Sequence, residues 1–179
     1  MTGIFIIYLS PFRGWYSRCI HKVLLTYAKS FESIFRRQSM NKIVHVAVGV
    51  IRRESDGGSF KYFLTKRLKK VHQGGKWEFP GGKVEKAETV AQALARELKE
   101  EVAIEVLSCQ PLIKVEHTYR GEGKVKTVCL DVFIVENFIG EPSAQEGQGQ
   151  GWFALSEFEQ LNFPAANKAI IDKLLENGL

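Results

Sequence analysis

Residues 81–104, GGKVEKAETVAQALARELKEEVAI, combine a glycine turn with the pattern of an amphipathic helix. Thr89 and Gln92 form a T-x-x-Q capping box, so the helix should begin beside Thr89. At about 100° per residue, one apolar stripe should face a core. It consists of Ala91, Leu94, Ala95, Leu98 and Val102. The stretch therefore predicts a helix over residues 90–102 that packs against the rest of the domain.

Three glutamates accompany this stripe. Glu97, Glu100 and Glu101 are three and four residues apart, so a helix brings their carboxylates to one patch. Two interpretations are open: a solvated acidic face with basic neighbours, or a site for a divalent cation. Oxygen ligands without nearby Cys or His favour Mg²⁺ or Mn²⁺ over zinc. Because Mg²⁺ often shares its ligand shell with substrate phosphates, the second interpretation predicts phosphoanhydride chemistry.

The same stretch resembles the Nudix box, G-x5-E-x7-R-E-U-x-E-E-x-G-U, in which U is a bulky aliphatic residue. The positions that match in register are Gly82, Glu88, Arg96, Glu97, Leu98, Glu100, Glu101 and Ile104. The late glycine of the pattern is Ala103 in this chain. A left-handed backbone after the helix should cost alanine about 1 kcal/mol there. We expect this departure to lower stability rather than activity.

The net charge of +5 belongs to the N-terminal piece. Residues 1–39 hold six basic and one acidic side chain, whereas residues 40–179 hold 19 of each. Stable nucleic-acid binding by the body is therefore not expected. The three cysteines, Cys19, Cys109 and Cys129, form no C-x-x-C pair. This spacing indicates reduced thiols in a cytoplasmic protein rather than a disulfide framework or a zinc site.

Residues 1–39 form a basic extension before a domain at 40–179. Their apolar run, residues 4–9, is far shorter than the ~20 residues that span a bilayer. No positive charge precedes it and no small-residue cleavage site follows, so it does not resemble a secretory signal. Three interpretations stay open: an over-extended start before Met40, a disordered tail, or a helix that packs on the body or contacts a membrane surface.

The remaining pattern predicts an α/β fold. Strands are expected at 43–52, 60–66, 77–80, 105–115 with an interruption at Pro111, 116–119, 124–135 and 152–154, and helices from Ser156 and over 165–176. Asp131 stands inside an apolar run, so it should face solvent or mark an edge. A mixed, curved sheet with the box helix on one side and the C-terminal helix on the other would form an α/β/α sandwich. The Nudix resemblance implies the same fold.

Beyond the box, residues 42–179 resemble the MutT-type 8-oxo-dGTP diphosphatases of the Nudix family. The supporting stretches are VAVGVI at 46–51, TKR at 65–67, EFPGGK at 78–83, QEGQ at 145–148 and FPAAN at 163–167. The resemblance implies that Glu97, Glu100, Glu101, Glu146 and the carbonyl of Gly81 bind the metal. It also implies that Glu97 or Glu146 takes a proton from water, and that Arg96 pairs with Glu88. The alternative for Glu146 is an ordinary loop carboxylate.

The resemblance also implies a pocket for the base. Arg67, Glu78 and the backbone of Phe79 would line it, and Lys126 lies where the family has a second arginine. A lysine lacks the planar guanidinium that stacks on a base, which weakens this assignment. The alternative for Arg67 and Lys126 is a solvated charge at a strand end.

Asn167 has a physical argument of its own. Guanine presents two acceptors, O6 and N7, and in the 8-oxo form N7 carries a hydrogen. A carboxamide offers a donor beside an acceptor, so Asn167 can pair with the oxidised base. Against normal guanine its oxygen would face the N7 lone pair, at a cost of about 1–3 kcal/mol. The alternative role is a helix N-cap after Pro164, and both roles can coexist.

The implied reaction is hydrolysis of 8-oxo-dGTP and 8-oxo-GTP at the β-phosphorus, which gives the monophosphate and pyrophosphate. Such an enzyme cleanses the nucleotide pool and prevents mutations during replication. A monomer in the cytoplasm is expected. Two alternatives remain: a Nudix hydrolase for another nucleoside diphosphate derivative, such as ADP-ribose, a dinucleoside polyphosphate or capped RNA, and a non-catalytic nucleotide-binding module.

Overall fold

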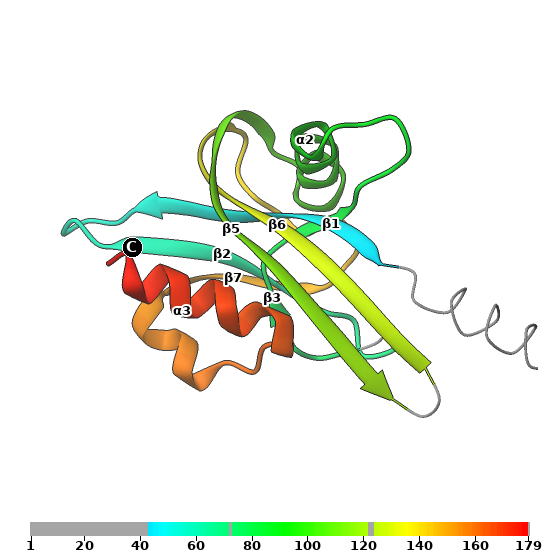
Figure 1. Ribbon diagram of the computed structural model, residues 1–179. Coiled ribbons are helices and arrows are strands. Elements are labelled where there is room, and N and C mark those ends of the chain that lie inside the picture. Colours follow the sequence, from blue (N-terminus) through cyan, green and yellow to red (C-terminus); the bar gives the residue numbers. More distant parts are fainter. Residues whose placement is uncertain (1–42, 72, 122–123, 179) are drawn as a thin grey trace, which may run out of the picture. The chain divides into compact units, whose positions relative to one another are not determined.

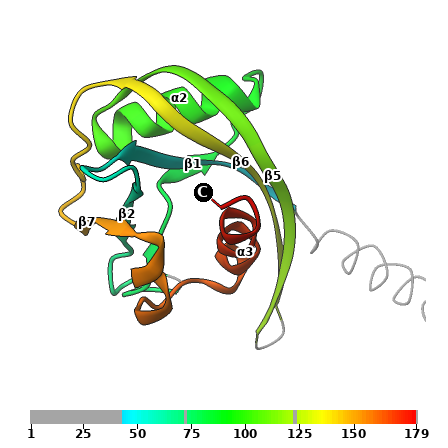
Figure 2. The ribbon, with the colours of Figure 1, turned by 90° about the vertical axis from the view of Figure 1, so that its left-hand side faces the viewer.

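A curved mixed sheet carries helix α2 on one face and helix α3 on the other (Figure 1, Figure 2). The computed structural model describes residues 43–71, 73–121 and 124–178, so the extension 1–39 lies outside the described residues. In chain order the elements are β1 (Val44–Glu54), β2 (Phe60–Lys66), β3 (Trp77–Glu78), β4 (Gly81–Lys83), α2 (Val90–Val102), β5 (Glu105–Gly121), β6 (Lys124–Ile139), β7 (Gly149–Ala154), the 3-10 turns η1 (Leu155–Gln160) and η2 (Ala165–Asn167), and α3 (Lys168–Glu176). The predicted α/β/α sandwich is confirmed.

Strand β1 joins the two halves of the sheet, whose order is β3-β2-β1-β6-β5. Its residues 44–51 pair in parallel with β6, whereas its last residues, 52–54, pair antiparallel with β2. β4 pairs antiparallel with residues 46–48 of β1, and β7 pairs with β2. This arrangement sets the glycine turn of β4 against the middle of β1 and beside helix α2.

Alternation along β1 divides the core into two layers. Ala47 and Ile51 pack with helix α2, whereas Val48 and Val50 pack with helix α3. Gly49 faces α2, because a Cβ built on it would lie 2.7 Å from Cδ1 of Leu98. The lack of a side chain at this position therefore lets the helix approach the sheet closely.

Helix α2 begins as predicted, but its buried face differs. Thr89 is the N-cap, and both hydrogen bonds of the capping box are present. Ala93 is fully buried, whereas Ala91, a member of the predicted stripe, is exposed. Since Ala93, Glu97 and Glu101 follow one another at four-residue intervals, the helix is turned so that this row faces the sheet. The predicted stripe is confirmed at Leu94, Leu98 and Val102, which are fully buried, and is wrong at Ala91.

Strands β5 and β6 form one long hairpin, which corrects two predictions. Pro111 does not interrupt β5; it lies among register shifts between Val106 and Ile113. β5 is an edge strand, and no strand pairs with its outer side. The missing N–H of proline therefore costs no hydrogen bond to a further strand there. Asp131 neither faces solvent freely nor marks an edge. It lies on the central strand β6, where its carboxylate pairs with His45 and Lys114.

The C-terminal segment closes the face opposite α2. Phe158 of η1 and Ile170 and Leu174 of α3 are buried in the layer that includes Val48 and Val50. The predicted helix over 165–176 is present as η2 followed by α3. Among the residues that the structure describes, no helix is long and apolar enough to cross a membrane.

Candidate active site

Two glycines of β4 form the seat for the carboxylates of helix α2. The N–H of Gly81 donates a hydrogen bond of 3.1 Å to Oε2 of Glu101. A Cβ on Gly82 would lie 2.1 Å from Cδ of Glu97, and a Cβ on Gly81 would lie 2.2 Å from the carbonyl oxygen of Ala47. Only residues without a side chain fit here, so the glycine turn allows the two glutamates to approach the sheet.

Arg96 holds the loop before α2 on the helix. Its Nη2 donates to Oε1 of Glu88 at 2.7 Å and to the carbonyl oxygen of Lys83 at 3.1 Å. Its Nη1 donates to Oε1 of Glu97 at 2.9 Å and to Oε2 of Glu100 at 3.3 Å. The side chain of Glu97 is 15% exposed and that of Glu100 is 62% exposed. Glu97 thus faces the site, whereas Glu100 lies on its outer rim.

Glu101 has the most perturbed acidity of the site. Burial raises its pKa to about 7, although the hydrogen bond from Gly81 opposes the shift. The negative charges of Glu97, Glu78 and Glu146 are smaller contributions to the same rise. The loop glutamate, Glu146, therefore contributes to the same acidic site as the helix.

This donor set fits a hard divalent cation. It combines carboxylate oxygens with the backbone of the glycine turn and includes no sulfur or imidazole. The carboxylate oxygens of Glu97, Glu100 and Glu101 are not all within 4.8 Å of one another. In the described part of the chain, the three residues whose potential ligand atoms are that close are His45, Cys129 and Asp131. Glu97 and Glu100 each form an ion pair with Arg96.

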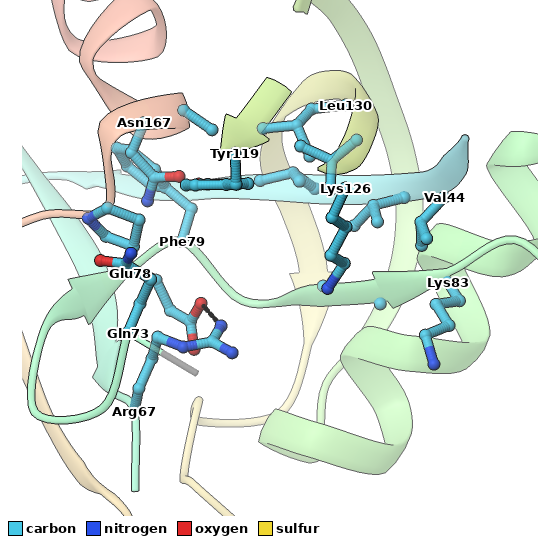
Figure 3. A pocket seen from close by; sticks show the side chains of 17 residues that line it. Val44, Arg67, Gln73, Glu78, Phe79, Lys83, Tyr119, Lys126, Leu130 and Asn167 are labelled. Atoms are coloured by element: carbon cyan, nitrogen blue, oxygen red, sulfur yellow. Dashed lines mark hydrogen bonds and ion pairs between the residues drawn. The ribbon is translucent and has the colours of Figure 1, made fainter. Parts of the chain in front are cut away.

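A cleft of about 230 Å³ opens on the α3 side of the sheet (Figure 3). It gathers all five residues predicted to bind the base, together with others that were not predicted. Its polar and aromatic lining comprises Arg67, Gln73, Glu78, Phe79, Lys83, Tyr119, Lys126 and Asn167. Arg67 and Glu78 form an ion pair on one side of the cleft, while Lys126 reaches in from β6 on another. Burial raises the pKa of Glu78, and the charge of Arg67 opposes that shift.

The carboxamide of Asn167 does not cap helix α3. The residue precedes α3 with helical backbone angles, φ −77° and ψ −16°, and its side chain makes no capping hydrogen bond. It is 8% exposed, and its Nδ2 has no hydrogen-bond partner in the described part of the protein. Because a buried amide donor without a partner is costly, this group is suited to a ligand that enters the cleft.

A second hollow of about 250 Å³ adjoins this cleft and includes two glutamates of the acidic site. It shares Arg67, Glu78 and Gly81 with the cleft and adds Glu101 and Glu146. The cleft and the acidic site are therefore neighbours, joined at the glycine turn. A nucleotide can lie across them with its base near Asn167 and its phosphates near the glutamates.

Three residues of these hollows were missed from the sequence. Tyr119 lies opposite Lys126 in the β5–β6 register, so the predicted hairpin could have revealed it. Gln148 belongs to the QEGQ stretch, and its buried Oε1 has no partner among the described residues. Gln73 has a left-handed backbone, φ 62°, and enters the cleft from the β2–β3 loop. Nothing in the sequence pattern indicated that position.

Comparisons with known proteins agree with this geometry. The NUDIX domain family matches residues 43–174. An 8-oxo-dGTP diphosphatase of Escherichia coli (strain K12) is 38% identical over 133 residues, which cover 74% of this chain and 97% of that protein. An 8-oxo-dGTP diphosphatase of Haemophilus influenzae is 37% identical over 134 residues, which cover 75% and 93%.

Solved structures show the same likeness. A structure from a study of MutT from Aliivibrio salmonicida and Vibrio cholerae is 34% identical, with a TM-score of 0.61, and covers 76% of this chain and 99% of that one. The family match spans most of the chain, and the relatives are matched over nearly their whole length. This chain therefore belongs to the Nudix family of hydrolases.

Proposed function

We propose that this enzyme hydrolyses 8-oxo-dGTP, and 8-oxo-GTP, to the monophosphate and pyrophosphate. It would thereby remove oxidised guanine from the nucleotide pool before replication uses it. The observation that carries the proposal is the buried carboxamide of Asn167, which has no capping bond and lies in a cleft beside the acidic site. The relatives named above support the same substrate by their names.

Base selection would rest on Asn167. Its free Nδ2 can donate to O6 of the base, and its oxygen can accept from the N7–H that only the oxidised base has. Phe79 is 4% exposed and lies beneath the cleft, so its backbone is held firmly. Lys126 would add a positive charge without planar stacking, which suits a carbonyl oxygen of the base better than its face.

The acidic site would bind the triphosphate through a metal ion. Nudix hydrolases generally need a divalent metal, and we propose Mg²⁺ because the donors are hard oxygens. Glu97, Glu101, Glu146 and the carbonyl of Gly81 would hold it, with Glu100 at the rim. The bound ion neutralises phosphate charge and lowers the pKa of water.

The protein's own residues orient the attack. The N–H of Ser143 donates to the carbonyl oxygen of Val102, and that of Gln145 donates to the carbonyl oxygen of Glu101, both at 2.9 Å. These bonds fasten the loop that carries Glu146 to the end of helix α2. We assign to Glu146 or Glu97 the removal of a proton from the water that attacks the β-phosphorus. The nucleoside monophosphate then leaves, and the water oxygen remains on pyrophosphate.

Product analysis on the full chain tests the proposal. The purified protein with Mg²⁺ is offered 8-oxo-dGTP, dGTP and ADP-ribose in parallel. We expect preference for 8-oxo-dGTP with release of pyrophosphate. Preference for ADP-ribose, or equal rates on the two guanine nucleotides, would refute the base assignment and leave only the Nudix chemistry.

The role of Glu97 has a separate test. Glu97→Gln removes the charge and keeps the shape, so we expect kcat to fall by about 100-fold or more while the fold is retained. Kinetics and a thermal melt on the same sample would check both statements. An active Glu97→Gln enzyme would exclude the proposed mechanism.

Two further properties belong to this proposal. Free nucleoside triphosphates form a cytoplasmic pool, so we place the enzyme in the cytoplasm. We also propose that it acts as a monomer, since each described domain contains both the acidic site and the cleft. Light scattering of the full chain after size-exclusion chromatography measures the oligomeric state directly.

A further inference from the structure

The α2 side of the sheet carries a second cluster of potential metal ligands, on strands β1 and β6 rather than on β4 and helix α2. His45 on β1 lies directly opposite Cys129 on β6 in the parallel register, and Asp131 follows Cys129 by two residues on the same face. One ligand atom from each of these three residues lies within 4.8 Å of the others. The base cleft uses the alternate residues of the same strands, Val46 and Leu130 among them. The sheet therefore separates this cluster from the base cleft.

We propose that His45, Cys129 and Asp131 form a second metal site, selective for a borderline-soft divalent ion such as Zn²⁺. An imidazole, a thiolate and a carboxylate are the three donor types that zinc takes in proteins. Mg²⁺ and Ca²⁺ prefer sites built of oxygen alone. One domain would then sort two metals by donor chemistry, with the hard ion at the glutamates and the softer ion here.

Burial and packing support a built site. Cys129 is 6% exposed, the side chain of Asp131 is 19% exposed and that of His45 is 37% exposed, so the site opens to solvent on the imidazole side. Nε2 of His45 already contacts Oδ2 of Asp131. All three ligands extend from paired strands, whose backbones hold them in place. The buried thiol of Cys129 lies beside the His45–Asp131 ion pair, so all three donor types are close together.

Two neighbours complete the surroundings. Glu116 lies opposite Cys129 across the β5–β6 pair, so it is on the same face of the sheet. By a change of rotamer, its carboxylate can supply an oxygen atom as the fourth ligand. Nζ of Lys114 lies 3.6 Å from Oδ1 of Asp131, but its side chain is 59% exposed and can turn into solvent. Binding would release the thiol proton of Cys129, and His45 would bind as the neutral imidazole.

The absence of a C-x-x-C pair predicted no zinc site in this chain. The fold changes that expectation, because the ligands come from two strands about 84 to 86 residues apart in sequence. The carbonyl oxygen of His45 accepts a hydrogen bond of 3.0 Å from the N–H of Val84, which begins the loop before α2. Metal binding would therefore stabilise the β1–β6 pair and the base of that loop.

Co²⁺ is the probe, because a cobalt–thiolate bond gives a charge-transfer absorption that oxygen ligands do not give. The full chain carries Cys19→Ser as its background, and excess Mg²⁺ occupies the glutamate site. We expect one Co²⁺ per chain with the thiolate absorption, displaced by one equivalent of Zn²⁺. Zn²⁺ should also raise the melting temperature.

The variants assign the ligands. Cys129→Ser should abolish the thiolate absorption, whereas the matched control Cys109→Ser should keep it, since Cys109 lies outside the cluster. His45→Gln should weaken Zn²⁺ binding by more than about tenfold, because even the loss of an outer-shell partner costs that much. It also keeps the test decisive if Cys129→Ser fails to fold.

Two outcomes would overturn the site. One is a parent protein without thiolate absorption. The other is Zn²⁺ binding that is unchanged in His45→Gln. Mg²⁺-dependent hydrolysis of 8-oxo-dGTP should be the same in the Cys19→Ser background and in Cys129→Ser. Failure of the zinc site can therefore be told apart from failure of the proposed function.

Discussion

Gly82 determines where the carboxylate of Glu97 can lie. A Cβ at this position would stand 2.1 Å from Cδ of Glu97, so Gly82→Ala must displace the glutamate or the turn. A displacement of about 1 Å in a metal site can cost about 100-fold in rate, and we expect kcat/KM to fall by that order. Steady-state kinetics with Mg²⁺ measure it.

A second glycine provides the matched control. Gly57 lies in the β1–β2 turn with φ 116°, and a Cβ built on it would meet no atom within 4 Å. Gly57→Ala should lose stability through backbone strain and keep its kcat/KM. If Gly82→Ala retained full activity, the close packing of Glu97 on the turn would have no catalytic role.

Asn167 should set selectivity rather than rate. Asn167→Ala removes both the donor and the acceptor, so the preference for 8-oxo-dGTP over dGTP should fall by about 5- to 150-fold, the equivalent of 1–3 kcal/mol. The rate on dGTP should change little, because the lost hydrogen bond to O6 is offset by removal of the repulsion between the carboxamide oxygen and the N7 lone pair. Competition between the two substrates measures the ratio, and an unchanged ratio would assign selectivity to another part of the cleft.

Helix α2 shows how far the sequence could predict an element. Its start followed from the capping box, because those hydrogen bonds are local. Its rotation did not, because half-burial of Glu97 and Glu101 depends on glycines in another strand. The box glutamates were predictable as site residues because their spacing is local, whereas the position of Gln73 depends on a loop conformation. Tyr119 was missed although the register of the predicted hairpin places it opposite Lys126.

The end of helix α2 carries the departure from the Nudix pattern. Ala103 is the C-cap with φ 58° and ψ 30°, the left-handed conformation that the pattern's glycine adopts easily. Ala103→Gly should raise the free energy of unfolding by up to about 1 kcal/mol and leave kcat unchanged. Ala91→Gly, the same change at an exposed position inside the helix, should lower it by about 1 kcal/mol. Urea denaturation of both variants should show opposite signs; equal signs would contradict the strain at Ala103.

At the scale of the molecule, the glycine turn connects the acidic site with the base cleft. The α2 side supplies the acidic groups, the α3 side supplies the base cleft, and Gly81 lines both hollows. This arrangement concentrates negative charge before any substrate arrives. The whole domain should therefore respond to pH and to divalent metal through the acidic site.

Glu101 determines whether stability rises or falls with pH. Its pKa is about 7 in the folded protein, raised by burial and by neighbouring carboxylates, and about 4.5 as the ordinary value. The folded state therefore keeps the proton over a range in which the unfolded chain releases it. Stability is highest below the ordinary pKa and falls as the pH rises to about 7. In EDTA, the free energy of unfolding should fall by up to about 2 kcal/mol between about pH 5 and pH 8.

Glu101→Gln isolates this contribution from other titrating groups. The variant cannot ionise at this position, so its stability should fall less than that of the parent over the same pH range. Mg²⁺ should restore stability to the parent near pH 8, where the carboxylate is charged, and should do less near pH 5, where protons compete for it. Urea denaturation at both pH values, with EDTA or with Mg²⁺, measures all four states. If the parent and Glu101→Gln lost stability equally between the two pH values, the burial of the Glu101 carboxylate would not govern the pH response.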